Sequence, residues 1–527
     1  MPFKRPSERN LLNSSVPVCN PLMLKCGCIA LLMLLAACGS SRKAVDAGID
    51  TSRKNLPDYG YHQVKLLNQV DDGYRGIWYF IGHIGGEYAY KYAGGLGTYP
   101  ANHYPFSVYV PKVHKTFFCY GGTSKDGKTL YHEVSYFDHR TGEVPRPTIV
   151  LDKGTGDAHD NPVIQVDAKG YLWLFSPTHG AGHTSFIHRS VRPYDIRHFE
   201  NVYPTKVEDG KEVALNNFSY PQVYYTPQRG FIMLFTHYQE EPLRYGKRTC
   251  RVIASMTSKD GIHWSAWKDI ANIEEGHYQT SGQWGKRIGT SFNYHPTRRT
   301  GAGLDYRTNL YYVYSDDNGK SWRTADGKIQ QMPLRTIGNS ALIHDYASEG
   351  LKVYINDLNF DKRGNPVILY ETTKGWEPGP ENGPRHWYTA HWTGSGWEIL
   401  PFTTSDNNYD MGSLYIESDG QWKVIAPTDP GPQAYNTGGG MVLWTSADEG
   451  RHWTKALQMT QGCERNQTYP RRPVNADSGF YAFWADGNGR RPSVSHLYFC
   501  NKAGAVFELP YQMNQQEQKP ESAFSSQ

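Results

Sequence analysis

Long apolar runs, clustered cysteines and blocks of like charge are all scarce in this chain of 527 residues. After residue 37 the sequence has no apolar run of roughly 20 residues, which excludes a protein with several membrane-spanning helices. The formal net charge is +4 and no basic block could follow a phosphate backbone, so nucleic acid is not an expected partner. The four cysteines beyond Cys38 lie far apart without a Cys-x-x-Cys pair, so their spacing gives no zinc site.

Glycine, proline and aromatic residues are abundant instead. The chain has 53 Gly, 32 Pro, 38 Tyr, 20 Phe and 14 Trp. A disordered chain would lack these aromatic residues, and a coiled coil or helical solenoid would be richer in Ala, Leu, Glu and Lys. Short β-rich runs alternate with Gly, Asp and Asn turns along the chain. The sequence therefore predicts an all-β protein.

The N-terminal residues resemble a targeting signal. Lys25 precedes the apolar run 26–35, and two alanines lead to Cys38. The pattern is similar to a bacterial lipoprotein signal, which implies that Cys38 is lipidated after cleavage. An ordinary signal peptide or a short membrane helix is the alternative reading, and Met23 is an alternative start to Met1.

These patterns predict four segments: a signal peptide over 1–37, a polar tether over 38–60, a β-propeller catalytic domain over 61–510 and a disordered tail over 511–527. We expect a monomer that a lipid anchors to the membrane, in the cell envelope and at the outer membrane.

A short motif, Ser-x-Asp-x-Gly-x-x-Trp, recurs at Ser315–Trp322 and Ser446–Trp453, with a shortened copy at Ser258–Trp264. The Asp caps its own turn, the Gly allows positive φ, and the Trp packs beneath the hairpin. The motif resembles the Asp-box of sialidase-type β-propellers. Hairpin clusters recur every ~55–65 residues, a period that suits four-stranded blades. We therefore predict a single-domain, seven-bladed β-propeller, with clusters near 104–138, 161–190, 219–268, 286–324, 351–393, 412–454 and 474–500.

Two histidines stand out as candidates for chemistry. A strand, a turn and a second strand separate His159 from His179, which brings both to the same end of one hairpin. Two imidazoles at one rim can bind a metal or an anion, or move protons near neutral pH. The alternative is that each histidine only satisfies buried backbone groups.

The surrounding segments Asp157-Ala-His-Asp-Asn-Pro162 and Thr178-His-Gly180 resemble a signature of BNR-repeat propellers. These include ulvan lyases, rhamnosyl-glucuronate lyases, related α-L-rhamnosidases and an oligosaccharide dehydratase. In such ulvan lyases a pair of His, a Tyr in a Tyr-Pro-Gln segment, an Arg and often a second Tyr line the cleft. The resemblance implies catalytic roles for His159, His179, Tyr220 and Tyr278.

The sequence departs from that pattern where the arginine should lie. Thr236-His237-Tyr238 occupies the expected place. The charge that neutralises a substrate carboxylate then comes from His237, Arg244, Arg248 or elsewhere, with Asn161 as a neutral donor. The resemblance alone implies a structural Ca²⁺ or Zn²⁺, and the sequence supplies no convincing ligand set for either.

The resemblance implies a carbon–oxygen lyase that acts by β-elimination on an ulvan-type, uronate-containing oligo- or polysaccharide. The reaction needs a base at C5, an acid at O4 and neutralisation of the carboxylate, and it needs no cofactor. Glycosidic cleavage and dehydration of a terminal uronate use the same chemistry, so the sequence leaves both open. The alternatives are an exo-α-L-rhamnosidase that uses His83 or His103, and a non-catalytic surface protein that binds glycans.

Overall fold

The computed structural model describes residues 65–96, 102–180, 183–243, 246–297 and 304–524, without the side chains of 240–249 and 304. Contacts divide the chain after Gly48, and every described residue belongs to the unit Ile49–Gln527. The predictions for the signal peptide, the tether and Cys38 lie outside the described residues. Among the described residues, no helix combines the length and apolar character needed to cross a membrane.

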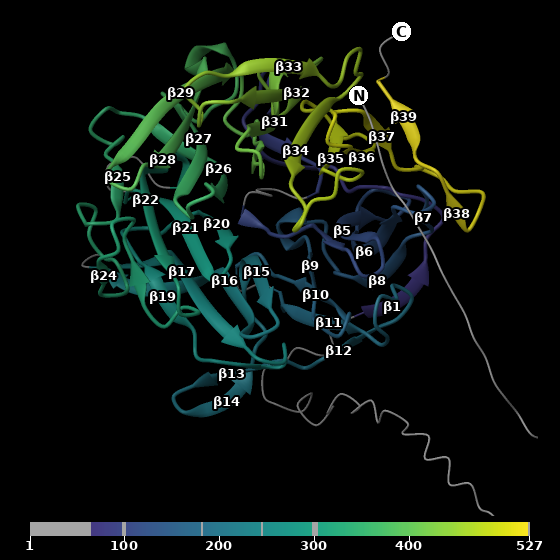
Figure 1. The fold of residues 1–527 in the computed structure, drawn as a ribbon, viewed down its shortest axis with the longest axis horizontal. Helices are drawn as coiled ribbons and strands as arrows, with labels where there is room; N and C mark the ends of the chain where they lie inside the picture. Colours follow the sequence, from purple (N-terminus) through teal and green to yellow (C-terminus); the bar gives the residue numbers. More distant parts are fainter. Residues whose placement is uncertain (1–64, 97–101, 181–182, 244–245, 298–303, 525–527) are drawn as a thin grey trace, which may run out of the picture. The chain divides into compact units, whose positions relative to one another are not determined.

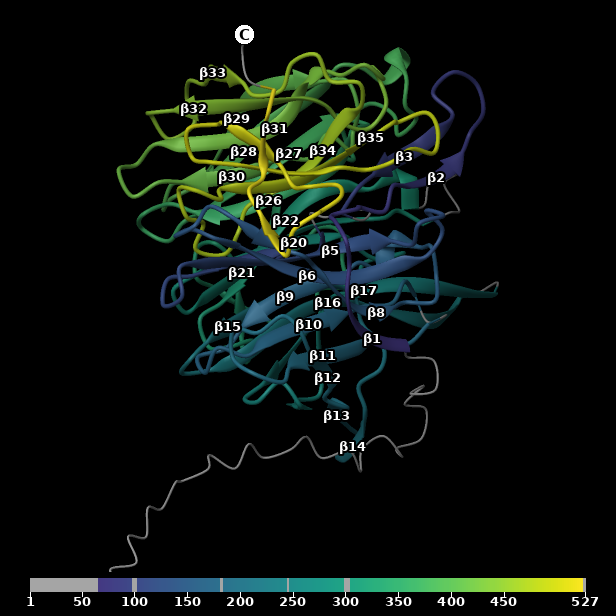
Figure 2. The same ribbon diagram turned by 90° about the vertical axis from the view of Figure 1, so that its right-hand side faces the viewer.

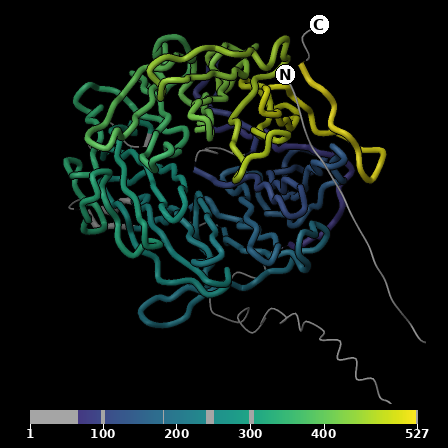
Figure 3. Tube along the Cα trace, in the orientation of Figure 1, coloured from purple at the N-terminus to yellow at the C-terminus, as the bar shows by residue number. Residues whose placement is uncertain are grey.

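The described strands form seven antiparallel blades around a common centre, which confirms the predicted fold class (Figures 1 and 3). Blade 1 contains β4 (Ser107–Val110), β5 (Lys115–Thr123), β6 (Leu130–Asp138) and β8 (Thr148–Asp152). Blade 2 contains β9 (Val163–Val166), β10 (Leu172–Ser176), β11 (Phe186–Ser190) and β12 (Phe199–Asn201). Blade 3 contains β15 (Ser219–Thr226), β16 (Gly230–Leu243), β17 (Gly246–Ser258), β18 (His263–Trp264) and β19 (Lys268–Ala271), joined by β13 (Thr205–Glu208) and β14 (Lys211–Ala214). Blade 4 contains β20 (Gln279–Trp284), β21 (Arg287–Tyr294), β22 (Thr308–Ser315), β23 (Trp322–Arg323), β24 (Ile329–Gln330) and β25 (Leu342–His344). Blade 5 contains β26 (Lys352–Phe360), β27 (Pro366–Thr373), β28 (Arg385–Trp392) and β29 (Trp397–Ser405). Blade 6 contains β30 (Ser413–Ile416), β31 (Trp422–Pro430), β32 (Gly439–Ser446) and β33 (Thr454–Gln458). Blade 7 contains β34 (Asn466–Arg471), β35 (Ala482–Gly487), β36 (Leu497–Cys500) and β37 (Val506–Glu508).

The remaining elements are short. They are β1 (Lys65–Val70), β2 (Tyr79–His83), β3 (Tyr90–Gly94), β7 (Val144–Pro145), β38 (Glu517–Gln518), β39 (Glu521–Ala523) and the 3-10 helices η4 (Ala158–Asp160), η6 (Leu304–Tyr306) and η7 (Pro380–Asn382). The β2–β3 hairpin extends from one face of the propeller, as the side view shows (Figure 2).

The C-terminal segment corrects one prediction. The sequence predicts a disordered tail over 511–527, but β39 pairs with β37 and β38 pairs with β7. Met513 is only 2 % exposed in the core that blades 1 and 7 share. The polar composition of this segment suggested disorder. An edge strand can nevertheless be ordered by backbone hydrogen bonds and a few buried apolar side chains.

The Asp-box turns fold as the motif predicts. In the copy at Ser258–Trp264, Asp260 Oδ1 accepts hydrogen bonds from the backbone N–H groups of residues 262 and 263. Gly261 has a φ of +77°, and Trp264 is 2 % exposed. The motif therefore fixes a hairpin between blades and takes no part in the site described below.

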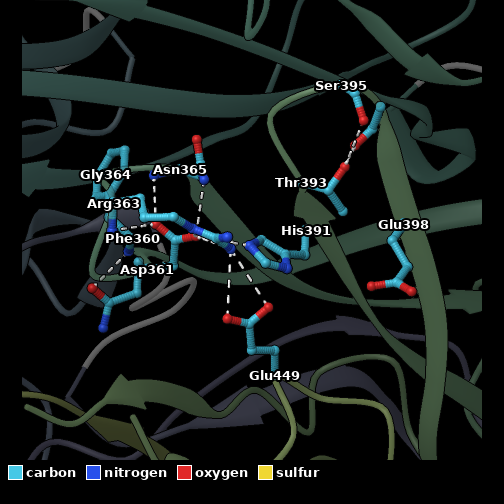
Figure 4. A network of polar contacts seen from close by, with 12 residues as sticks. Phe360, Asp361, Arg363, Gly364, Asn365, His391, Thr393, Ser395, Glu398 and Glu449 are labelled. Atoms are coloured by element: carbon cyan, nitrogen blue, oxygen red, sulfur yellow. Dashed lines mark hydrogen bonds and ion pairs between the residues drawn. The ribbon is translucent and has the colours of Figure 1, made fainter. Parts of the chain in front are cut away.

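A second kind of turn joins β26 to β27. Asp361 accepts hydrogen bonds from the backbone and side chains of Arg363 and Asn365, and also from His391 Nε2 at 3.1 Å (Figure 4). Burial alone would raise the pKa of Asp361, but these donors outweigh it and hold the pKa well below its usual range. One carboxylate thus ties the turn to the third strand of blade 5.

Candidate active site

Each described blade presents one imidazole or phenol ring near the centre of the propeller. Each ring belongs to a residue that lies within the first strand of its blade or shortly before it. These residues are His103, His159, Tyr220, Tyr278, Tyr354, Tyr409 and Tyr469. Ring centroids are 5.6 Å apart for Tyr220 and Tyr278 and 5.2 Å apart for Tyr354 and Tyr409. None of the seven is more than 7 % exposed. The predicted residues His159, Tyr220 and Tyr278 therefore belong to one central ring of side chains.

Local backbone geometry positions the tyrosines of blades 3 and 7. Tyr220 and Tyr469 have φ values of +50° and +55°, and each is followed by a proline. The strand register shifts at both places, between Ser219 and Gln222 and between Thr468 and Arg471. Such a bulge inserts an unpaired residue and re-aims its side chain.

Asp157 joins the two predicted histidines. Its carboxylate lies 2.5 Å from His159 Nδ1 and 2.8 Å from His179 Nδ1. Asp157 also caps η4 by accepting from the His159 N–H, and Asp160 Oδ1 accepts from the His179 N–H at 2.6 Å. The two imidazoles stack with centroids 4.0 Å apart and planes 21° apart. The structure therefore brings together the pair that the sequence predicts.

This arrangement assigns the ring protons. A carboxylate only accepts, so both Nδ1 atoms carry a proton, and in a neutral imidazole the Nε2 atom then keeps a lone pair. His159 Nε2 lies 2.8 Å from the Tyr92 hydroxyl, which donates to it. The His179 side chain is 31 % exposed, so its Nε2 lone pair is the one that can meet a ligand.

The electrostatics keep these groups in defined charge states. Burial lowers the pKa of His159 to about 4, although Asp157 acts in the opposite direction. Burial alone would raise the pKa of Asp157, but hydrogen bonds from the two imidazoles outweigh it and hold the pKa well below its usual range. At neutral pH the carboxylate is therefore ionised and the His159 ring is neutral.

Tyr220 lies beside both imidazoles, with centroids 6.2 Å from His159 and 6.3 Å from His179. Its hydroxyl is buried and lies beside the Tyr238 hydroxyl. Burial raises the pKa of Tyr220 well above its usual value, and Tyr238 and Tyr278 raise it further. Burial also raises the pKa of Tyr238 to about 12, with Arg251 acting in the opposite direction. At neutral pH these phenols are therefore proton donors.

Arg251 on β17 supplies a cation that the sequence analysis missed. It pairs across the sheet with Tyr238, and its guanidinium lies 5.5 Å from the Tyr238 ring. The backbones of Arg251 and Gly276 form a bridge that a side chain at Gly276 would block, since a Cβ there would lie 2.4 Å from the Arg251 nitrogen. This close approach brings Arg251 near Tyr278. The pairing of β16 with β17 places residue 251 opposite residue 238, so knowledge of this register would have identified the arginine.

Arg307 and Lys91 complete a cationic side of the site. Arg307 is 2 % exposed, with its guanidinium 4.6 Å from both the Tyr278 and Tyr354 rings. Lys91, on β3, forms an ion pair with Asp305. Burial and the nearby Arg307 and Arg251 lower the pKa of Lys91 to about 7, while the ion pair favours the charged form.

Two predicted binding residues lie differently from the prediction. His237 Nε2 donates to Asp269 at 2.8 Å, and its ring stacks on Trp267 with centroids 4.6 Å apart, whereas the ring of the next residue, Tyr238, lies beside that of His179. Strand alternation accounts for this placement, because neighbouring residues of a strand point to opposite faces. Asn161 is fully buried against Gly121, without a hydrogen-bond partner for its side chain. Arg244 and the side chain of Arg248 lie outside the described residues.

Asp157, His159 and His179 are also the group of described residues whose ligand atoms lie close enough to hold a metal, within 4.8 Å of one another. Their present geometry fits hydrogen bonding better. A metal would have to replace the hydrogen bonds that both Nδ1 atoms make to the Asp157 carboxylate. Both Nδ1 protons would also have to leave.

A family described as "BNR repeat-containing family member" matches residues 114–405 of this chain. No curated protein matches the chain at a significant level.

Solved structures of polysaccharide lyases share the fold. An ulvan lyase described as a new family of polysaccharide lyase, PL25, aligns with a TM-score of 0.59 at 16 % identity, over 82 % of this chain and 96 % of that chain. An ulvan lyase of that family bound to -[GlcA(1-4)Rha3S]- gives the same TM-score and identity over 83 % and 96 %. Polysaccharide lyase Uly1 gives 0.54 at 12 % identity, over 83 % and 99 %. At these identities the likeness establishes the propeller fold.

Proposed function

The chain belongs to the BNR repeat-containing family, and we propose that it is a carbon–oxygen lyase that acts by β-elimination on a uronate-containing glycan. One observation carries the proposal: an ionised Asp157 holds two imidazoles beside the protonated phenol of Tyr220. A base and an acid of this kind are what elimination requires at neighbouring atoms.

The steps follow from the proton assignment. His179 Nε2 removes the C5 proton of the uronate, and the C–H electron pair forms the C4=C5 double bond. The C4–O4 bond breaks, and the Tyr220 hydroxyl gives its proton to the departing O4. Exchange with solvent then removes the proton from His179 and returns one to Tyr220. Asp157 stabilises the imidazolium that forms, and Tyr92 holds the neighbouring His159 in place.

Arg251 has the task of neutralising the substrate carboxylate. The C5 proton is acidic only when charge that develops on the carboxylate is stabilised. Arg251 is partly exposed, whereas Arg307 is enclosed by tyrosines, so Arg251 is the guanidinium able to contact a ligand. Arg307 and Lys91 add positive potential near Arg251.

The neighbour with bound -[GlcA(1-4)Rha3S]- supports a substrate of ulvan type, in which a uronate is linked to a sulfated rhamnose. Dehydration of a terminal uronate uses the same proton transfers, so the product mass distinguishes the two reactions. The rhamnosidase alternative would need a separate site at His103 or His83. The His103 ring belongs to the same cluster as Tyr220, with centroids 5.4 Å apart, and His83 lies in β2 of the hairpin.

The test is ultraviolet absorbance of the purified domain with ulvan and with rhamnosyl-uronate oligosaccharides, together with product masses. We expect rising absorbance from a 4,5-unsaturated uronate, and its loss in Tyr220→Phe and His179→Ala. Free rhamnose with flat absorbance would replace the proposal with a hydrolase. Intact substrate that still binds would replace it with a glycan-binding protein.

We also propose that Cys38 carries a lipid that anchors the protein at the outer membrane of the cell envelope. The alanine pair before Cys38 supports this proposal. We expect radiolabelled palmitate to enter the wild-type protein and not Cys38→Ser, which should be released in soluble form. Label in the variant would contradict the assignment.

A further inference from the structure

The β2–β3 hairpin is not part of any blade, yet it contributes to the site. Tyr92 on β3 donates to His159 of blade 2, and its ring packs at a tilt against that of Tyr409 of blade 6, with centroids 4.6 Å apart. The next residue, Ala93, donates its N–H to Thr437 and accepts from the Tyr469 hydroxyl at 3.1 Å. The strand therefore lies across the central ring of side chains on the side of blades 6 and 7.

The tip of the hairpin is fixed to the same side. Glu87 forms an ion pair with Arg490 at 2.9 Å, and the same guanidinium lies over the Tyr88 ring at 5.4 Å. Asn436 donates to the Tyr88 carbonyl at 2.7 Å, and the rings of Tyr88 and Tyr435 meet edge to face. These contacts come from blades 6 and 7.

Lys91 extends the contact toward blades 4 and 5. Its ammonium pairs with Asp305 and lies 5.5 Å from the Trp376 ring. Strand β3 thus bonds to or packs on described residues of blades 4 to 7, in addition to His159 of blade 2.

The central ring is buried on every described blade, so the exposed polar side chains beside it show where the site opens. Tyr354, Tyr409 and Tyr469, from blades 5 to 7, are 1 %, 0 % and 0 % exposed. On blade 2, the side chains of Asp157 and His179 are 28 % and 31 % exposed. A sugar can therefore approach the imidazoles from the side of blade 2, and the hairpin blocks its passage over blades 5 to 7.

We propose that the β2–β3 hairpin restricts the site to the end of a glycan chain, so that the enzyme is exo-acting. A polymer bound in its middle needs space on both sides of the reacting unit, and this site offers space on one. The inference rests on the proposed lyase function for its substrate class, whereas the geometry of the blocked side does not depend on which bond is broken.

The experiment uses ulvan fractions of defined chain length and two readouts. The first compares unsaturated product with polymer molar mass during early turnover. We expect absorbance to rise while molar mass stays nearly constant and one small product accumulates. A rapid fall in molar mass at low absorbance would overturn the exo assignment and leave β-elimination intact.

The second readout is the stoichiometry with which Tyr220→Phe binds each fraction, measured by sedimentation or calorimetry. A chain-end site binds one protein per chain at every length, and a continuous groove binds more as the chain lengthens. One protein per chain without unsaturated product from the wild type would support the hairpin inference and overturn the lyase. Several proteins per chain, or no binding to any fraction, would overturn the inference.

Loosening the hairpin tests its role directly. Tyr88→Ala combined with Arg490→Ala removes the tip contacts while the blades remain intact. We expect more than one molecule of this variant to bind each long glycan chain, and we expect the variant to lower polymer molar mass faster than the wild type. Ile84→Ala is the matched control, because Ile84 lies in the same tip and is 42 % exposed. If the loosened variant still binds with one protein per chain, an element other than the hairpin blocks the site.

Discussion

At the scale of single residues, the site depends on where protons lie. Tyr220→Phe removes one oxygen and leaves the ring that packs against Tyr278 and His103. We expect kcat to fall by about 10²–10⁴-fold, the usual range for losing a general acid, with little change in KM. Initial rates of absorbance increase measure this, and Tyr278→Phe should lose less because its ring is one position further from the imidazoles. Equal losses in both variants would contradict the assignment of the acid.

His159 makes a second prediction at this scale, on stability against pH. Its pKa is about 4 in the folded protein and about 6.5 in an unfolded chain, so the unfolded state binds more protons between those values. The folded state therefore loses stability as pH falls from about 6.5 to 4, by up to about 3 kcal/mol from this group. Urea unfolding at pH 7 and 4.5 measures the loss, which should be smaller in His159→Asn. The neighbouring Asp157 loses its contribution in the same direction at lower pH. An identical loss in the variant would show that His159 is not the group responsible.

At the scale of the structural element, turns differ in how much they contribute. Asp361 receives five hydrogen bonds and binds His391, which is 1 % exposed, so Asp361→Ala leaves buried donors unpaired. We expect the free energy of unfolding to fall by about 2–4 kcal/mol. In the next blade Asp419 accepts from the Gln421 N–H at the tip of an exposed turn. Asp419→Ala is therefore the control and should change stability by under about 1 kcal/mol in a urea titration. Equal effects would mean that the His391 contact contributes nothing.

At the scale of the whole molecule, the local patterns predicted the fold well. The Asp-boxes and the spacing of hairpins identified seven blades because each blade is a local unit that repeats. His159 and His179 were predicted from their spacing along one hairpin, and Tyr220 and Tyr278 from the resemblance to the BNR-repeat pattern. Arg251 and Arg307 were missed because their placement depends on cross-strand register and contacts between blades. Tyr92 and Lys91 were missed for the same reason, since a hairpin before blade 1 reaches residues more than 200 positions away.

Closure of the propeller is the remaining property at this scale. The C-terminal strand β39 covers the edge of β37, Met513 is buried beside blade 1, and Arg146 of blade 1 donates to the Met513 carbonyl at 2.8 Å. Removing residues 511–527 would therefore expose an unpaired strand edge and open a cavity between the first and last blades. We expect that truncation to lower the unfolding midpoint and promote aggregation, as measured by thermal scans with light scattering. Truncation after Phe524 keeps β39 and the contact of Phe524 with Tyr498, so it should behave as the full chain does. If both truncations are equally stable, closure depends instead on the bridges of Gly76 to Gly122 and Ser495, where the N-terminal segment joins blades 1 and 7.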